Sequence, residues 1–166
     1  MSPPAARGSR TGWGIDLHPL NGRPPLKLAG VVVSEDVGVE ATSDGDVLAH
    51  AVVDAILGAC VLGDIGDHFP SDQPEMAGAD SMEMLRVVAR LAADAGWQVS
   101  HLDATVVTDK ARVAPHREAI RASLASGIGI DGDVVSVKAT TTDGLGFVGR
   151  GEGIVATAVV TVAPRS

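Results

Sequence analysis

Aromatic residues are scarce in this chain: its 166 residues include two Trp, two Phe and no Tyr. A buried core must therefore be built from aliphatic side chains, and an aliphatic core favours β-sheets covered by helices. Hydrophobic residues make up 45% of the chain and charged residues 20%, which is typical of globular rather than disordered proteins. The length is that of one domain.

Cysteine and long apolar runs are also nearly absent. Cys60 is the only cysteine, so no disulfide can form within the chain, and the reducing cytoplasm is the expected compartment. No apolar run reaches the roughly 18 residues that a membrane span needs, and the first ten residues lack a secretory apolar run. We expect residues 1–10 to be a disordered lead-in, residues 11–166 to form a single domain, and no membrane to be involved.

Positive charge is outnumbered, with 13 Lys and Arg against 21 Asp and Glu, which gives a formal net charge of −8. Repulsion from a phosphate backbone argues against a nucleic-acid partner. A phosphorylated small molecule can still bind where metal ions, helix N-termini or a few cations neutralise its charge locally.

The periodicity of the apolar residues predicts the strands. Residues 11–18 alternate with period two, and residues 26–33 are typical of a short hairpin. Further strands are predicted at residues 97–108, 133–139 and 154–162.

Three helices are expected between these strands. Residues 46–62 should form a buried helix, with N-cap oxygens offered by Ser43 and Asp44. Residues 81–95 should follow an Asp80 cap, residues 115–126 should begin with a proline, and residues 63–79 should form a long loop. This order predicts an α+β fold with a mixed β-sheet and helices on one face.

Asp16 and His18 lie two residues apart on the first predicted strand, so their side chains project from the same face. His50, on the first predicted helix, offers a third ligand. Three nitrogen and oxygen ligands leave a fourth tetrahedral position open, which is typical of catalytic zinc. The alternative is a strand-end carboxylate beside a histidine that ordinary hydrogen bonds satisfy.

The run Ser43-Asp44-Gly45-Asp46 precedes the first helix. It is either a cap and turn alone or a site where free N–H groups and the helix dipole bind phosphate. Asp46 and Asp54 lie four residues before and after His50, so either can orient its second ring nitrogen unless both are solvated.

Two later segments carry ligand-type side chains. Residues 138–143 end a strand with three hydroxyls and a carboxylate, suited to phosphate oxygens and a hard divalent ion, or simply to a polar strand end. Residues 149–153 place Arg150 and Glu152 between glycines, which form a flexible turn or approach a ligand or neighbouring subunit closely.

Together these segments resemble the 2-C-methyl-D-erythritol 2,4-cyclodiphosphate synthase family of the non-mevalonate isoprenoid route. The resemblance spans about residues 12–162. The motifs that carry it are Gly14-Ile15-Asp16-Leu17-His18, Ser43-Asp44-Gly45-Asp46 with His50, Leu62-Gly63-Asp64-Ile65-Gly66, Gly78-Ala79-Asp80-Ser81, and Ala139-Thr140-Thr141-Thr142-Asp143 through Gly149-Arg150-Gly151-Glu152-Gly153.

The resemblance implies a homotrimer with active sites between subunits, zinc held by Asp16, His18 and His50, and a second ion, Mg²⁺ or Mn²⁺, near Asp143. It implies a lyase that closes a cytidine-diphosphate-linked methylerythritol phosphate into a ring and releases CMP, without a protein nucleophile. Thr141 and Thr42 are the implied catalytic positions. The implied substrate-binding set is Asp16, His18, Thr42, Ser43, Asp64, Ile65, Gly66, Phe69, Thr108, Asp109, Lys110, Ala111, Arg112, Val113, Thr140, Thr141, Thr142, Asp143, Phe147 and Arg150.

The sequence departs from the family pattern at several of these positions. Thr42 stands where the family usually has His, and loss of a preorganised donor can reduce a rate by about 10²–10³. Asp143 replaces a common Glu, Ala111-Arg112 a common Pro-Lys, and Ser71 a common Asp.

Two alternatives follow from these departures. One is a specialised paralogue that acts on another cytidylylated phosphate or phosphonate. The other is a non-catalytic trimeric binding protein that retains zinc and nucleotide affinity and holds an isoprenoid-like ligand near Arg150 and Glu152 at the trimer axis. His101 and His116 are expected to be surface or capping residues, and so is His68 unless it substitutes for the missing His.

Overall fold

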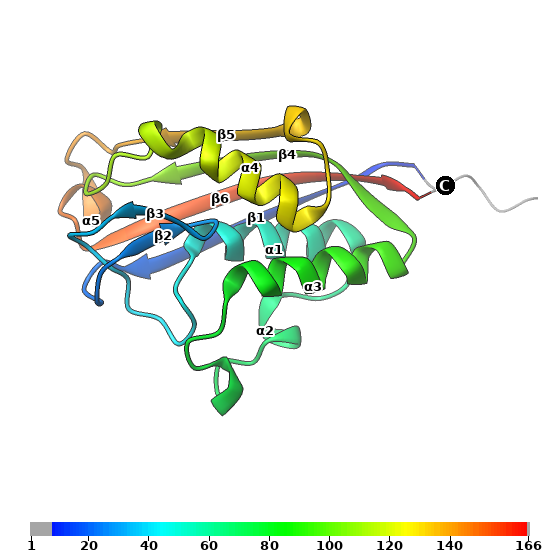
Figure 1. The fold of residues 1–166 in the computed structure, drawn as a ribbon, viewed down its shortest axis with the longest axis horizontal. Coiled ribbons are helices and arrows are strands. Elements are labelled where there is room, and N and C mark those ends of the chain that lie inside the picture. The colour runs from blue at the N-terminus through cyan, green and yellow to red at the C-terminus, as the bar shows by residue number, and fades with distance from the viewer. Residues whose placement is uncertain (1–7, 166) are drawn as a thin grey trace, which may run out of the picture.

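A four-stranded sheet in the order β1-β6-β4-β5 organises the chain (Figure 1). The computed structural model describes residues 8–165. β4 runs parallel to β5, whereas β6 is antiparallel to both β1 and β4, so the predicted mixed sheet is confirmed. The strands are β1 (Arg10–Pro19), β4 (Trp97–Val107), β5 (Val135–Thr140) and β6 (Gly153–Pro164).

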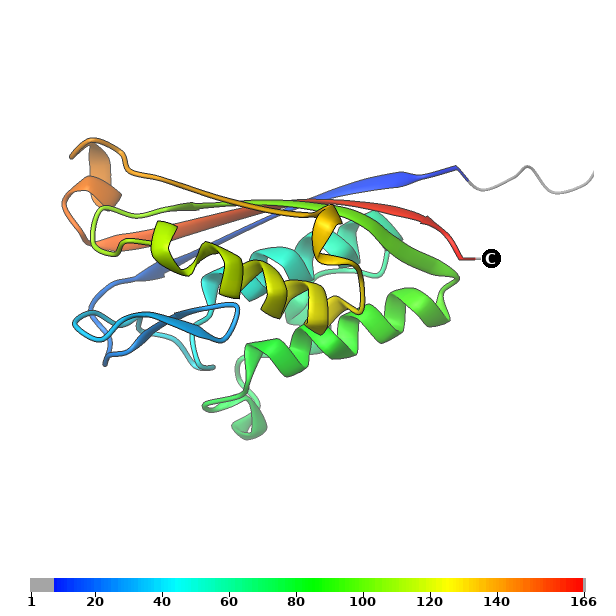
Figure 2. The same ribbon diagram turned by 45° about the horizontal axis from the view of Figure 1, so that its top comes forward.

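Three helices cover one face of this sheet, as predicted, and Figure 2 shows them all below it. They are α1 (Val47–Cys60), α3 (Ser81–Asp94) and α4 (Arg117–Ile128). Their inner faces and the sheet enclose a core in which Val, Leu, Ile and Ala predominate. This single-domain α+β arrangement confirms the predicted fold class.

Two glycines of β1 set the distance between the sheet and α1. A Cβ at Gly12 would lie 2.0 Å from the carbonyl oxygen of Ala55, and one at Gly14 would lie 2.1 Å from that of Ala51. No other residue fits there without moving the helix, so the backbones of β1 and α1 pack directly against each other.

The opposite face of the sheet carries exposed apolar side chains. On β1, Trp13, Ile15 and Leu17 are 61%, 40% and 48% exposed, and on β6 Val159 is 38% exposed. Because side chains alternate along a strand, these β1 residues point away from the helices while Asp16 and His18 point toward them.

The predicted hairpin forms a separate two-stranded sheet of β2 (Leu26–Leu28) and β3 (Val31–Ser34). Ala29 and Gly30 connect the strands, and both have positive φ. Strands and helices elsewhere begin and end within a few residues of the predicted bounds.

Some local expectations were wrong. Residues 63–79 contain two short helices, α2 (Ile65–His68) and η1 (Pro74–Met76), because Asp64 and Asp67 form a reciprocal capping box and Pro74 starts a turn. Short helices also occur at η2 (Ala114–His116), η3 (Gly132–Val134) and α5 (Gly146–Gly149). The N-cap of α1 is Asp46 rather than Ser43 or Asp44.

The lead-in predicted for residues 1–10 falls largely outside the described residues, and β1 already begins at Arg10. Within residues 8–165, none of the helices combines the length and the apolar character that crossing a membrane would require.

Candidate metal centre and substrate pocket

Asp16, His18 and His50 converge on one point, as the sequence predicted. The Oδ2 atom of Asp16 lies 3.0 Å from Nε2 of His18 and 3.0 Å from Nδ1 of His50. The two ring nitrogens are 3.4 Å apart. One possible ligand atom from each residue thus lies within 4.8 Å of the other two.

The local fold explains this convergence. Alternation along β1 turns Asp16 and His18 toward α1, and the two glycines bring α1 close enough for His50 to reach them. Asp46 fixes the start of α1: its fully buried carboxylate accepts hydrogen bonds from the backbone N–H groups of Ala49 at 3.0 Å and Gly30 at 2.6 Å. His50 lies one turn further along the helix.

The charges at this centre are complementary. Burial alone would raise the pKa of Asp16, but hydrogen bonds and charge from His18 and His50 lower it to about 2. The hydrogen bond to Asp16 raises the pKa of His18 above its usual range, although burial opposes this. Asp16 is therefore a carboxylate at neutral pH, and the histidine lone pairs beside it suit a divalent cation.

The other side of the His50 ring contacts two hydroxyls. Oγ of Ser81 lies 2.8 Å and Oγ of Ser43 3.3 Å from Nε2 of His50. The expectation that Asp46 or Asp54 orients this nitrogen was wrong: Asp46 binds the backbone described above, and Asp54 accepts a hydrogen bond from the N–H of Ile65 at 2.8 Å. Burial raises the pKa of both aspartates.

Sequence reasoning gave Ser81 no role. It follows an Asp80 cap, as many helix-start residues do, and nothing in the local pattern shows that its hydroxyl lies against a residue 31 positions away.

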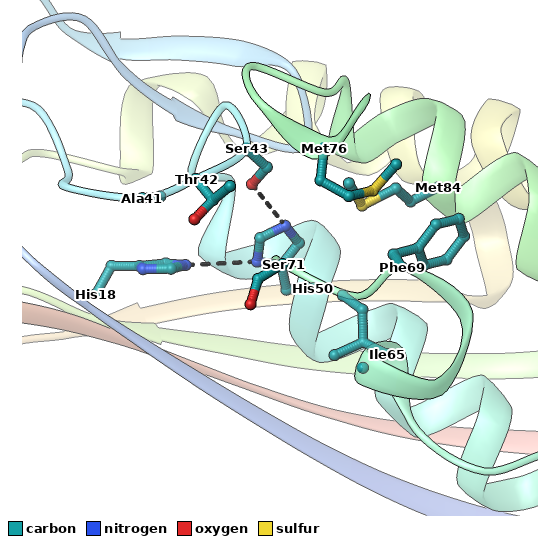
Figure 3. Close-up of a pocket in the computed structure, with 11 residues that line it drawn as sticks. His18, Ala41, Thr42, Ser43, His50, Ile65, Phe69, Ser71, Met76 and Met84 are labelled. Atoms are coloured by element: carbon teal, nitrogen blue, oxygen red, sulfur yellow. Dashed lines mark hydrogen bonds between the residues drawn. The ribbon is translucent and has the colours of Figure 1, made fainter. Parts of the chain in front are cut away.

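A pocket of about 250 Å³ opens beside the metal centre (Figure 3). Thr42, Ser43 and the two histidines border one side, while Phe69 and two methionines lie on the other. Five of the predicted substrate-binding positions besides His18 line this pocket: Thr42, Ser43, Ile65, Gly66 and Phe69. Its other lining residues are His18, Ala41, His50, Ser71, Met76 and Met84.

Two predicted residues near this pocket have other contacts. Asp64 is exposed, and its side chain accepts a hydrogen bond from the N–H of Asp67 at 3.1 Å. His68 is also exposed, and its Nε2 lies 2.8 Å from the carbonyl oxygen of Leu62. His68 is absent from the pocket lining, so its interaction is a capping one at the end of α1.

The remaining predicted residues lie in loops after β4 and β5. Asp109 links the two loops, because its carboxylate accepts hydrogen bonds from the N–H and hydroxyl of Thr142, at 2.9 and 3.0 Å, and from the N–H of Gly144. These bonds lower the pKa of Asp109, led by the bond from the Thr142 N–H. Thr108 is buried, and its N–H donates to the carbonyl oxygen of Thr140.

Other side chains of these loops remain open to solvent. Thr140, Thr141 and Asp143 are exposed, and the hydroxyl of Thr141 donates to Asp143 at 3.1 Å. Lys110 and Arg112 are exposed, Ala111 is half-buried and Val113 is buried. Arg150 makes a salt bridge with Glu152 at 2.8 Å.

These loops and the metal centre share one end of the sheet but not one location. β5, which leads into residues 141–145, is the edge strand opposite β1, with β6 and β4 between them. Three strand spacings separate the two edges by about 14 Å. Phe147 is an exception, because it lies with Leu17 and His18 around a shallow hollow at the end of β1.

Comparison with known proteins is consistent with this geometry. Residues 9–163 match the model of the YgbB family. The chain belongs to this family. It is 53% identical over 151 residues to the 2-C-methyl-D-erythritol 2,4-cyclodiphosphate synthase of Shewanella halifaxensis, covering 91% of this chain and 95% of the relative.

Two solved structures are also similar to this chain. The bifunctional IspDF of Campylobacter jejuni matches with a TM-score of 0.93 and 37% identity, over 97% of this chain and 43% of that longer chain. The CDP complex of IspF from Plasmodium falciparum matches with a TM-score of 0.84 and 30% identity, over 96% and 98% of the two chains.

Proposed function

We propose that this chain converts 4-diphosphocytidyl-2-C-methyl-D-erythritol 2-phosphate to 2-C-methyl-D-erythritol 2,4-cyclodiphosphate and CMP. The reaction is an intramolecular phosphoryl transfer: an oxygen of the 2-phosphate attacks the phosphorus of the diphosphate that is distal to the cytidine, and the bond from that phosphorus to CMP breaks. The relatives carry the name of this synthase, and one solved relative binds CDP. The observation that best supports this proposal is that Asp16, His18 and His50 converge beside a pocket able to hold a phosphate.

The donor set at this centre fits zinc, because one carboxylate and two imidazole nitrogens converge on a single point. When bound, zinc supplies a positive charge that stabilises the phosphate oxygens during transfer. The chain's own residues hold and orient the substrate. Thr42 and Ser43 line the pocket, and in this proposal their hydroxyls donate to phosphate oxygens.

We further propose that the second ion, Mg²⁺ or Mn²⁺, binds through the exposed carboxylate of Asp143. Thr141, whose hydroxyl contacts Asp143, acts with Thr42 as a catalytic donor to the transferring phosphoryl group. The ribose contacts Asp64 and Gly66. The diphosphate contacts Thr140, Thr141 and Thr142, and the cytosine contacts the backbone of residues 108–113.

The proposed assembly is a homotrimer that works in the cytoplasm. Two observations support a shared site. The metal centre lies at the β1 edge of the sheet while the loops of residues 108–113 and 140–143 follow β4 and β5 on its other side, and the uncovered face of the sheet exposes Trp13, Ile15 and Leu17. Neighbouring copies that pack these faces together can bring one copy's metal centre to another copy's loops. Phe147 and Arg150, at the same end, would border the axis where an isoprenoid-like ligand fits.

The test is a CMP-release assay with the methylerythritol substrate, zinc and magnesium, combined with light scattering for mass. We expect CMP and the cyclic diphosphate in equal amounts from a particle of three chains. A monomer with full turnover would contradict the shared site, and absence of the cyclic product would contradict the activity.

A second function is favoured by one residue. Thr42 lines the pocket with a short side chain where the family usually has the larger His, and the extra space suits a different cytidylylated phosphate or phosphonate. Under this alternative the same assay yields no cyclic diphosphate, and a substrate of that other class releases CMP.

A further inference from the structure

The ring of His50 lies between the metal centre and a chain of hydrogen bonds that leads away from it. Nε2 of His50 contacts Oγ of Ser81 at 2.8 Å, and the same hydroxyl donates a hydrogen bond to Oδ1 of Asp44. Ser81 is fully buried, and the side chain of His50 is 11% exposed. Bulk water therefore has little access to this side of the ring.

The chemistry of the three groups determines where the protons lie. A carboxylate accepts hydrogen bonds and does not donate them, so the single proton of the Ser81 hydroxyl is directed to Asp44. The oxygen of Ser81 then accepts from His50, which places the ring proton on Nε2. A ring that carries this proton and no other has its lone pair on Nδ1, the atom that faces Asp16 and His18, and a cation bound there takes the place of the hydrogen bond between Nδ1 and Asp16.

Ser43 is the competing partner for Nε2, but its hydroxyl is farther away, at 3.3 Å, and accepts a hydrogen bond from the N–H of Gly45. It also lines the pocket. Ser81, by contrast, is closer, buried and absent from the pocket lining.

The backbone holds this chain of hydrogen bonds in place. The N–H of Gly78 donates to the carbonyl oxygen of Thr42 at 2.8 Å, and the N–H of Asp44 donates to that of Ala79 at 3.1 Å. Asp80 caps α3 at the next position, accepting from the N–H of Met82. These hydrogen bonds thus hold Ser81, the first residue of α3, beside Asp44.

We propose that Ser81 and Asp44 are positioning residues that fix the proton of His50 on Nε2 and thereby reserve Nδ1 for the metal. The inference rests on the zinc centre of the proposed function. Hydrogen bonds to the second nitrogen of a metal-binding imidazole set its orientation and ligand strength, and their loss typically lowers metal affinity by about 10–100-fold.

Zinc affinity of the full-length, zinc-loaded protein, measured by competition with a chromophoric chelator, tests this proposal. We expect Ser81→Ala and Asp44→Ala each to weaken zinc binding by about 10–100-fold. Asp44→Asn should recover much of the loss, because the amide oxygen can still accept from Ser81. Ser100→Ala is the matched control: Ser100, near the start of β4, donates to the carbonyl oxygen of Thr161 at the end of the sheet away from the metal centre, so zinc affinity should be unchanged.

Nitrogen-15 NMR of the zinc-loaded wild type gives an answer that does not depend on any variant. The expected spectrum has zinc on Nδ1 of His50 and a slowly exchanging proton on Nε2, and Ser81→Ala should accelerate that exchange. Zinc on Nε2, or unchanged affinity and exchange in both alanine variants, would overturn the inference.

The two proposals fail in different ways. A wild-type chain that binds no zinc, or binds it independently of His50, would contradict the proposed metal centre. A wild type that binds zinc through His50, with Ser81→Ala indistinguishable from it, would contradict only the positioning role. If Ser81→Ala does not fold, Asp44→Ala and the wild-type spectrum decide.

Discussion

The two halves of the candidate site differ in how they are built. The metal centre sits on β1 and α1, where side chains contact one another and a buried network supports them. The loops of residues 108–113 and 140–145 are joined mainly through the Asp109 carboxylate, and most of their ligand-type side chains are exposed. A single chain therefore preorganises its metal ligands, whereas its proposed nucleotide contacts await a substrate or a neighbouring copy.

The largest effect should come from breaking the preorganised half. We expect His50→Ala to remove zinc and reduce turnover by at least about 10³-fold, because one of three protein ligands is lost. Metal analysis and CMP release would measure this. His101→Ala, an exposed histidine on β4, serves as the control and should retain both. Full zinc occupancy in His50→Ala would disprove the ligand assignment.

Thr42→His probes the pocket beside the metal centre. If the chain is a true synthase, the added imidazole can donate to the attacking phosphate, and turnover should rise by as much as about 10²-fold, most strongly below about pH 6.5 where it is protonated. Turnover of both proteins from pH 5.5 to 8, with saturating metals, measures the effect. If Thr42→His were no faster than the wild type at any pH, the threonine would not be what limits turnover.

Zinc binding should weaken as the pH falls. The hydrogen bond to Asp16 raises the pKa of His18. A proton therefore begins to compete with zinc for the ligand nitrogen at a higher pH than it would at an ordinary histidine. Below that pKa, affinity should fall by about tenfold per pH unit for each proton displaced. Chelator competition from pH 8 to 5.5 tests the sign, and an affinity that rises on acidification would contradict it.

The smallest effect should arise in the loop half. Asp109→Ala removes the acceptor that joins Thr142 and Gly144, so we expect the KM for the cytidylylated substrate to rise by about tenfold while zinc affinity stays unchanged. Asp131→Ala is the matched control, because it removes an exposed carboxylate that caps η3 and lies outside both loops. A parallel loss of zinc would mean that the two halves are not independent.

Sequence patterns captured the parts of this molecule that depend on local periodicity. Alternation in β1 placed Asp16 and His18 on one face, and the apolar run of residues 46–62 correctly indicated a buried helix. The partners of His50 could not be obtained in this way. Ser81 contacts His50 only through the tertiary fold. Asp46 lies one helical turn from His50, but its carboxylate caps α1 and accepts a hydrogen bond from the N–H of Gly30 instead.

The loop half was harder to derive for the same reason. The resemblance named Asp109 and Thr142 together, but neither spacing nor composition shows that one carboxylate joins two loops 33 residues apart. The short helix α2 depends on one reciprocal capping box. That box lies in a stretch rich in Gly, Pro and Asp, whose composition predicts a loop.

The close contact between β1 and α1 also selects the pairing register of β1. A slip of one residue would turn Trp13 and Ile15 toward the helix, where only Gly12 and Gly14 fit, and would turn Asp16 and His18 outward. The two glycines therefore exclude the shifted pairing sterically. The metal ligands therefore face α1 because the pairing slipped by one residue cannot close against this helix.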